Sequence, residues 1–81
     1  MFDDALQQNL CDLDAFLAIR ELNRNDRVAG LITECLDLGS LPGAEVVARL
    51  GQLSFDRKHV GITLKGGPWR RSDDGLYHLD P

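Results

Sequence analysis

The 81-residue sequence predicts a single, mostly helical α+β domain, in which three to four helices precede a C-terminal β-hairpin wing. Apolar residues recur every three or four positions through most of the chain, which is typical of amphipathic helices. From residue 69 onward the pattern changes to two short strand-like runs around an Asp-Gly turn signal. The hydrophobic fraction of 43% indicates that one core can form without a metal or a disulfide.

The first helix is predicted over residues 2–23, within an N-terminal element (1–24) that precedes a core at 26–81. Its ends carry acidic and then basic residues, which suit the helix macrodipole. A break near residues 9–12 is an alternative, because Asn9 and Asp12 can each cap a new helix. This helix either covers the core or forms a dimerisation or partner-docking element. Its apolar stripe comprises Phe2, Leu6, Leu10, Leu13, Phe16, Leu17 and Ile19.

A second helix is predicted over residues 27–38, after a polar connection and before Gly39, a typical stop residue. Its buried face is expected to comprise Val28, Leu31, Ile32, Cys35 and Leu36. Cys11 and Cys35 both lie in apolar-periodic segments, so both are predicted to be reduced core residues.

A third, shorter helix is predicted to start at residues 40–43, with Pro42 in its first turn, and to stop at Gly51. Its buried residues are expected to be Val46, Val47 and Leu50. Ser54 is predicted to cap a fourth helix over residues 55–65, which the Gly-Gly-Pro run at 66–68 ends. Val60 and Leu64 are its expected core pair, although the alternation over residues 60–64 also fits a strand.

A hairpin is predicted from the two runs that flank residues 73–75. A three-residue loop with Gly75 in the left-handed conformation places Trp69 opposite Leu79 and Arg71 opposite Tyr77. Trp69 is then a core residue rather than a platform for stacking. His78 points outward by strand alternation.

The order of these elements resembles the winged helix-turn-helix family over residues 26–79. Residues 41–51 resemble its positioning helix and glycine turn, residues 54–65 its recognition helix, and residues 69–79 its wing. The resemblance implies that the recognition helix enters the major groove of DNA, while the wing touches the backbone or the minor groove.

The net charge of −4 argues against a generic polybasic DNA-binding protein, but the charge is unevenly distributed. Residues 55–71 hold five Lys and Arg against one Asp, a net +4, whereas the remainder holds four basic and twelve acidic residues, a net −8. The positive charge therefore lies where the resemblance places the DNA-facing surface. Arg57 and Thr63 are candidates for reaching base edges. The predicted contacts to double-stranded DNA are Arg57, Lys58, His59, Thr63, Lys65, Arg70 and Arg71.

The first hypothesis is therefore a transcriptional regulator or replication accessory factor of bacterial or mobile-element type. The alternative is an acidic protein–protein interaction module, an inhibitor or adaptor, that uses the same scaffold without binding DNA. A basic protein partner, or a second copy through the first helix, then meets the acidic half. The residues expected to contact that partner are Asp3, Asp4, Asp12, Asp14, Asp26, Glu34 and Asp37.

Other chemistry is not expected. No set of residues suits catalysis, so an enzyme and a small-molecule substrate are not predicted. His59 and His78 lack partners at metal-ligand spacing, and no cofactor motif is present, so neither a metal nor a cofactor is expected. The N-terminus does not read as a secretory signal, and no apolar run is long enough for a membrane span, so a soluble cytoplasmic protein is expected.

Overall fold

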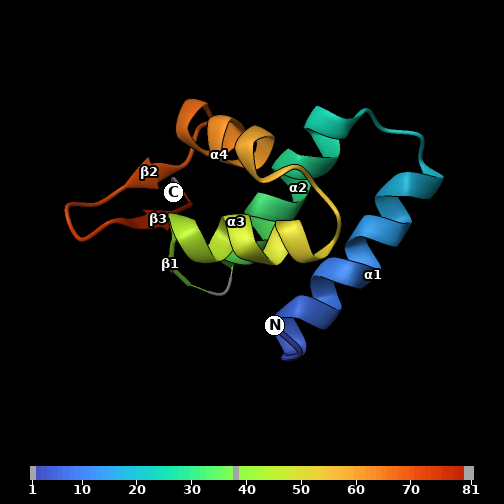
Figure 1. Cartoon of the computed structure of the whole chain (residues 1–81), viewed down its shortest axis with the longest axis horizontal. Coiled ribbons are helices and arrows are strands. Elements are labelled where there is room, and N and C mark those ends of the chain that lie inside the picture. Colours follow the sequence, from blue (N-terminus) through green and yellow to red (C-terminus); the bar gives the residue numbers. More distant parts are fainter. Residues whose placement is uncertain (1, 38, 80–81) are drawn as a thin grey trace.

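The computed structural model describes residues 2–37 and 39–79, and it confirms the mostly helical α+β class (Figure 1). A small antiparallel sheet joins β1 (Leu41–Pro42), β3 (Leu76–His78) and β2 (Arg70–Arg71), in that spatial order. In chain order the elements are α1 (Ala5–Ile19), α2 (Arg24–Asp37), β1 (Leu41–Pro42), α3 (Gly43–Gln52), α4 (Arg57–Gly66), β2 (Arg70–Arg71) and β3 (Leu76–His78).

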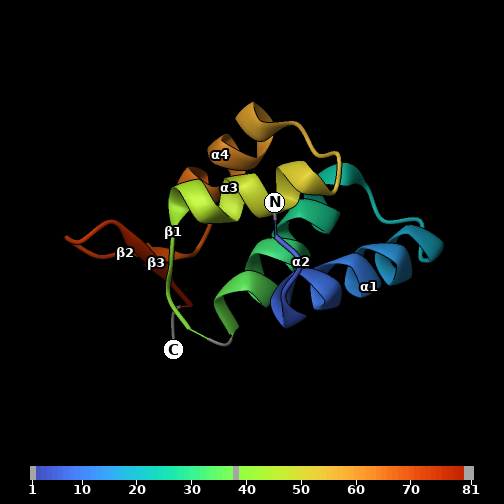
Figure 2. The same cartoon turned by 60° about the horizontal axis from the view of Figure 1, so that its bottom comes forward.

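The core forms where α2, α3 and α4 pack on one another, while α1 lies along α2 and the sheet closes the opposite end (Figures 1 and 2). Leu31 and Ile32 of α2, Leu50 of α3 and Val60 of α4 are fully buried there. Tyr77 brings β3 into the same cluster. The predicted anchors of α2, α3 and α4 are therefore confirmed, except that Val47 is only half-buried.

α1 is shorter than the predicted helix over 2–23, and its apolar stripe is only partly covered. Asp4 caps its start, since the carboxylate accepts the backbone N–H of Gln7 at 3.0 Å. The helix is continuous through residues 9–12. The prediction that Phe16, Ile19 and Cys11 lie in the core is wrong: the first two are 52% and 80% exposed, and Cys11 is exposed as well. The reason is that α1 packs on little besides α2, which covers only one side of it.

α2 starts one turn earlier than predicted, at Arg24 instead of residue 27. Asn23 accounts for this, because its side chain accepts the backbone N–H of Asp26 at 2.8 Å and so satisfies the first turn. The predicted end at Leu38 lies outside the described residues. Cys35 is buried and free as predicted, and burial raises the pKa of its thiol to about 12.

β1 was not predicted. Leu41 and Pro42 were assigned to the start of the third helix, but they pair with Tyr77 and Leu76 of β3. Pro42 has an extended backbone and caps α3 without a side-chain hydrogen bond. A two-residue strand has no sequence period of its own, so only the tertiary partner defines it.

The connection between α3 and α4 also differs from the prediction. The cap of α4 is Asp56, which accepts the backbone N–H of His59, and the helix begins at Arg57 rather than at Phe55. Ser54, the predicted cap, has a left-handed backbone with φ of 75°. Phe55 turns inward and is only 6% exposed, while its backbone N–H donates to the carbonyl of Leu50.

The hairpin has the predicted register, with Arg71 opposite Tyr77. Gly75 has the predicted left-handed backbone, with φ of 84°. A hydrogen bond from the Ser72 hydroxyl, and then one from the backbone N–H of Leu76, holds the pKa of Asp74 below its usual value. Trp69 packs partly buried against the core, as expected.

A buried cation fastens α1 to the core. The Arg49 side chain, on α3, lies 2.8 Å from one Asp4 oxygen and 2.9 Å from the other, and 2.9 Å from Glu45. Gln7 donates to the carbonyl of Arg49 at 3.1 Å, and the ring of Phe2 covers the guanidinium at 4.2 Å. Sequence reasoning did not single out Arg49, because a lone arginine on an amphipathic helix is normally solvated.

Replacing Asp4 by asparagine is expected to destabilise the protein at pH 7 and to matter less as the pH falls. Hydrogen bonds from Arg49, and then from the backbone of Gln7, hold the pKa of Asp4 well below its usual range. A carboxyl whose folded pKa is depressed stabilises the fold fully above its unfolded pKa of about 4, and this stabilisation is lost progressively as the pH falls from that value toward the depressed folded pKa. Asparagine keeps the helix cap but removes the charge.

Urea unfolding of wild type and Asp4→Asn at pH 7 and at pH 3.5 checks this prediction. The difference between the urea midpoints of the two proteins should be smaller at the lower pH. Asp3→Asn, which removes an exposed neighbouring charge, is the matched control and should leave the midpoint unchanged at pH 7. A gap for Asp4→Asn that is equal at both pH values would contradict the prediction.

Candidate nucleic-acid interface

The orientation of α4 decides which of its side chains are available to a ligand. Val60 and Leu64 are buried one turn apart and fix the inner side of the helix. Lys58, Ile62 and Lys65 are exposed on its outer side. Ile62 is 62% exposed although its side chain is large and apolar, so no element in the described part of the chain covers this side of α4.

A groove lies where the start of α3, the side of α4 and the hairpin meet, and we call it the basic groove. Lys65 from α4 and Arg71 from β2 both line it, although they lie six positions apart in sequence. The lining contains no Asp or Glu, and neither cation pairs with a carboxylate of the described residues. The lining residues are Pro42, Gly43, Ala44, Val47, Gly61, Leu64, Lys65, Arg71, Gly75 and Tyr77.

Two glycines give the basic groove its shape. A Cβ at Gly61 would meet no atom within 4 Å, so the missing side chain leaves the wall of α4 open beside Lys65. At Gly43 a Cβ would lie only 2.9 Å from the Tyr77 ring, so this glycine lets α3 start directly against the hairpin. Gly61 was not among the residues predicted to form the site. Gly61 lies one helical turn before Lys65, and this spacing was the sequence signal that could have indicated a hollow beside Lys65.

Arg57 and Lys58 lie at the other end of α4 from the basic groove. The Arg57 side chain extends over Gly51, where a Cβ would come within 2.9 Å of its Nε atom. It lines a separate hollow with Phe2 and Gln52. This is the C-terminal end of α3, where a cation suits the helix dipole.

His59 and Thr63 do not join the basic groove. Both are half-buried, and helical spacing places them on the side of α4 away from Gly61 and Lys65. The Nε2 atom of His59 is buried and has no hydrogen-bond partner among the described residues. Neither residue is placed to reach DNA from the side on which Lys65 lies.

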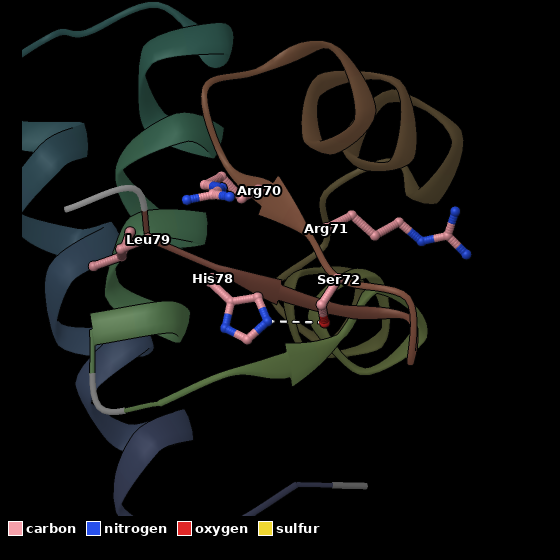
Figure 3. A pocket seen from close by; sticks show the side chains of 5 residues that line it. All are labelled: Arg70, Arg71, Ser72, His78 and Leu79. Atoms are coloured by element: carbon pink, nitrogen blue, oxygen red, sulfur yellow. Dashed lines mark hydrogen bonds between the residues drawn. The ribbon is translucent and has the colours of Figure 1, made fainter.

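Arg70 and Arg71 point away from each other on opposite sides of β2, as neighbours in a strand do (Figure 3). Both arginines line a second hollow with His78, but Arg71 also lines the basic groove, which Arg70 does not. The predicted cluster of five cations is therefore divided: the structure brings Lys65 and Arg71 together and places the other three elsewhere.

His78 joins three segments of the chain instead of facing solvent alone. Its Nε2 atom lies 2.9 Å from the Ser72 hydroxyl, and its Nδ1 atom contacts the hydroxyl of Ser40 (Figure 3). The Ser72 hydroxyl also donates to Asp74 and lies 3.2 Å from the carbonyl oxygen of Leu76. These contacts tie His78 both to the residue before β1 and to the turn of the hairpin.

The acidic residues predicted to contact a protein partner are not all available. Asp4 is held by Arg49, and Asp14 lies 2.8 Å from the guanidinium of Arg27. Glu34 is half-buried. The exposed members that form no ion pair among the described residues are Asp3, Asp12, Asp26 and Asp37.

Metal and membrane chemistry find no support in the described residues. No group of three His, Cys, Asp or Glu side chains is placed there to hold a metal ion. No helix within residues 2–37 and 39–79 is long and apolar enough to cross a membrane.

Comparison with known proteins finds no matching family model, no matching curated protein and no matching solved structure.

Proposed function

We propose that this chain binds double-stranded DNA through the basic groove and the adjoining outer side of α4, as a small winged helix-turn-helix protein of transcription or replication. The observation that carries the proposal is the convergence of Lys65 and Arg71 on one groove without a neighbouring carboxylate. The order of helices and hairpin, from which the resemblance was drawn, agrees with it.

In this mode of binding, the groove receives a phosphate backbone. Lys65 and Arg71 neutralise phosphate oxygens from two sides, and Arg71 is able to do so with two parallel N–H donors. The first amides of α3 border the same groove, and Pro42 leaves them without a side-chain cap. Backbone N–H groups at a helix start are good phosphate donors. Lys58 and Ile62 then face the bases or the neighbouring strand from the outer side of α4.

The acidic remainder of the chain shapes how such binding behaves. Outside residues 55–71 the net charge is −8, which on balance repels DNA from the rest of the molecule. Because one small cationic face contacts only a few phosphates, the affinity for DNA should depend only modestly on the salt concentration.

Replacing both Lys65 and Arg71 by glutamine is expected to weaken binding to a DNA duplex roughly 10- to 60-fold near 0.1 M salt. Two lost phosphate contacts lower the slope of log K against log salt by about 1.8, which corresponds to about 60-fold at that salt concentration. Fluorescence anisotropy with a labelled duplex between 50 and 200 mM salt measures both quantities.

The matched control removes the same charge from the opposite end of the molecule, as Arg20→Gln with Arg24→Gln. Both side chains are exposed and lie at the junction of α1 and α2. The control should keep the wild-type slope. Absence of binding at 50 mM salt, a flat salt dependence, or an equal loss in the control would each overturn the proposal.

A further inference from the structure

The outer side of α1 carries an exposed apolar strip that the fold leaves uncovered, and we call it the outer stripe. Four of its members fall at positions i, i+4, i+7 and i+8 and therefore share one side of the helix, and Phe16 borders them next to Ile19. Phe16 is 52% and Ile19 is 80% exposed, although both are large and apolar. The outer stripe comprises Cys11, Ala15, Phe16, Ala18 and Ile19, all of which are exposed.

We infer that the outer stripe is the interface of a homodimer in which α1 packs antiparallel on α1 of a second copy. The inference does not depend on DNA binding. Figure 1 shows α1 at one end of the long axis and the hairpin at the other, so pairing through α1 leaves both basic grooves open.

Size complementarity favours a second copy in the antiparallel direction. A two-fold axis near residue 17 places Ile19 of one copy against Ala15 of the other. The large side chain then meets a small one, which is how well-packed helix pairs interdigitate. A parallel pair would instead place Ile19 on Ile19 and Ala15 on Ala15.

Charge favours the same arrangement. Arg20 follows the outer stripe and lies 5.4 Å from the ring of Phe16, while Asp12 lies two turns earlier. In the antiparallel pair, Asp12 of one copy lies within one helical turn of Arg20 of the other. In a parallel pair, like charges would face each other, which is unfavourable. The two helix dipoles are also opposed only in the antiparallel pair.

The size of the interface sets the strength to expect. Five residues per copy are few against the roughly 20–30 per side of a standard interface, so the dimer should be weak, with Kd on the order of 10–100 μM. Sedimentation equilibrium over about 5–500 μM should therefore show a shift from monomer to dimer.

Ile19→Asp is expected to abolish the dimer without lowering the thermal midpoint, because Ile19 makes little contact within its own chain. Ile62→Asp is the matched control, since Ile62 is also an exposed isoleucine but lies on α4. It should dimerise as wild type does. A wild type that stays monomeric at 500 μM overturns the inference and leaves the outer stripe to a different protein. A dimer that survives Ile19→Asp overturns it as well.

Disulfide trapping tests the direction of pairing. In a Cys11→Ser background, Ala15→Cys and Ile19→Cys proteins are mixed, oxidised and analysed by mass spectrometry. The antiparallel pair brings position 15 of one copy within disulfide reach of position 19 of the other, so the mixed disulfide should dominate. Predominant 15–15 and 19–19 disulfides would instead indicate a parallel pair and overturn the arrangement.

Discussion

Replacing Arg49 by alanine is expected to lower the free energy of unfolding by about 3 kcal/mol, the largest single effect of a polar residue in this chain. Arg49 is only 5% exposed and bonds to Asp4, Glu45 and Gln7. Removing the guanidinium leaves these groups without their partner and opens a space beneath the ring of Phe2.

The loss is large in relation to the whole protein. A domain of this size has about 4–12 kcal/mol of stability, so 3 kcal/mol is a quarter or more of it. The thermal midpoint should fall by roughly 12–24 °C. Because Arg49 holds Asp4 and Gln7 of α1, the loss should appear first as local opening of α1, which hydrogen exchange at the amides of that helix would detect.

Two variants separate charge from volume at this position. Arg49→Met keeps the aliphatic volume and should still be destabilising, since the carboxylates of Asp4 and Glu45 remain unpaired. Arg57→Ala removes an exposed arginine that has no ion pair among the described residues, and it should change stability by less than about 0.5 kcal/mol. A change for Arg49→Ala as small as that for Arg57→Ala would contradict the role assigned to Arg49.

The helices were predictable because their signals are repeated. Four helices appear where the 3.6-residue period is strong, and Val60 with Leu64 was enough to orient α4. The ends of the helices were less predictable, since Asn23, Asp26, Ser54 and Asp56 are all able to cap and only tertiary packing selects among them.

The candidate site was predictable in composition but not in geometry. The sequence locates the positive charge between residues 55 and 71, and strand alternation places Arg70 and Arg71 on opposite sides of the hairpin, but the sequence does not show that Arg71 is the one that faces α4. That arrangement depends on the register of the hairpin and on β1, a two-residue strand formed only by contact with β3. The outer stripe was misassigned for a similar reason: periodicity identifies an apolar side but not whether anything covers it.

Replacing Phe55 by alanine is expected to cost about 3–5 kcal/mol of unfolding free energy, the range for truncating a buried phenylalanine. Sequence reasoning placed Phe55 at the start of a helix and did not name it among the core residues. The structure instead buries its ring, with the guanidinium groups of Arg24 and Arg27 lying 5.8 and 5.3 Å from the ring centre. The ring thus joins the start of α2 to the turn between α3 and α4.

Phe16→Ala provides the matched comparison, because the same side chain is removed from a half-exposed position on α1. At protein concentrations where the chain is monomeric, urea unfolding should show less than about 1 kcal/mol of loss for Phe16→Ala. If the two variants lose equal stability, burial of Phe55 is not what fixes the turn. If only Phe55→Ala is costly, the turn between α3 and α4 depends on one aromatic ring that lies outside both helices. This turn orients α4 and so directs Lys65 toward the hairpin.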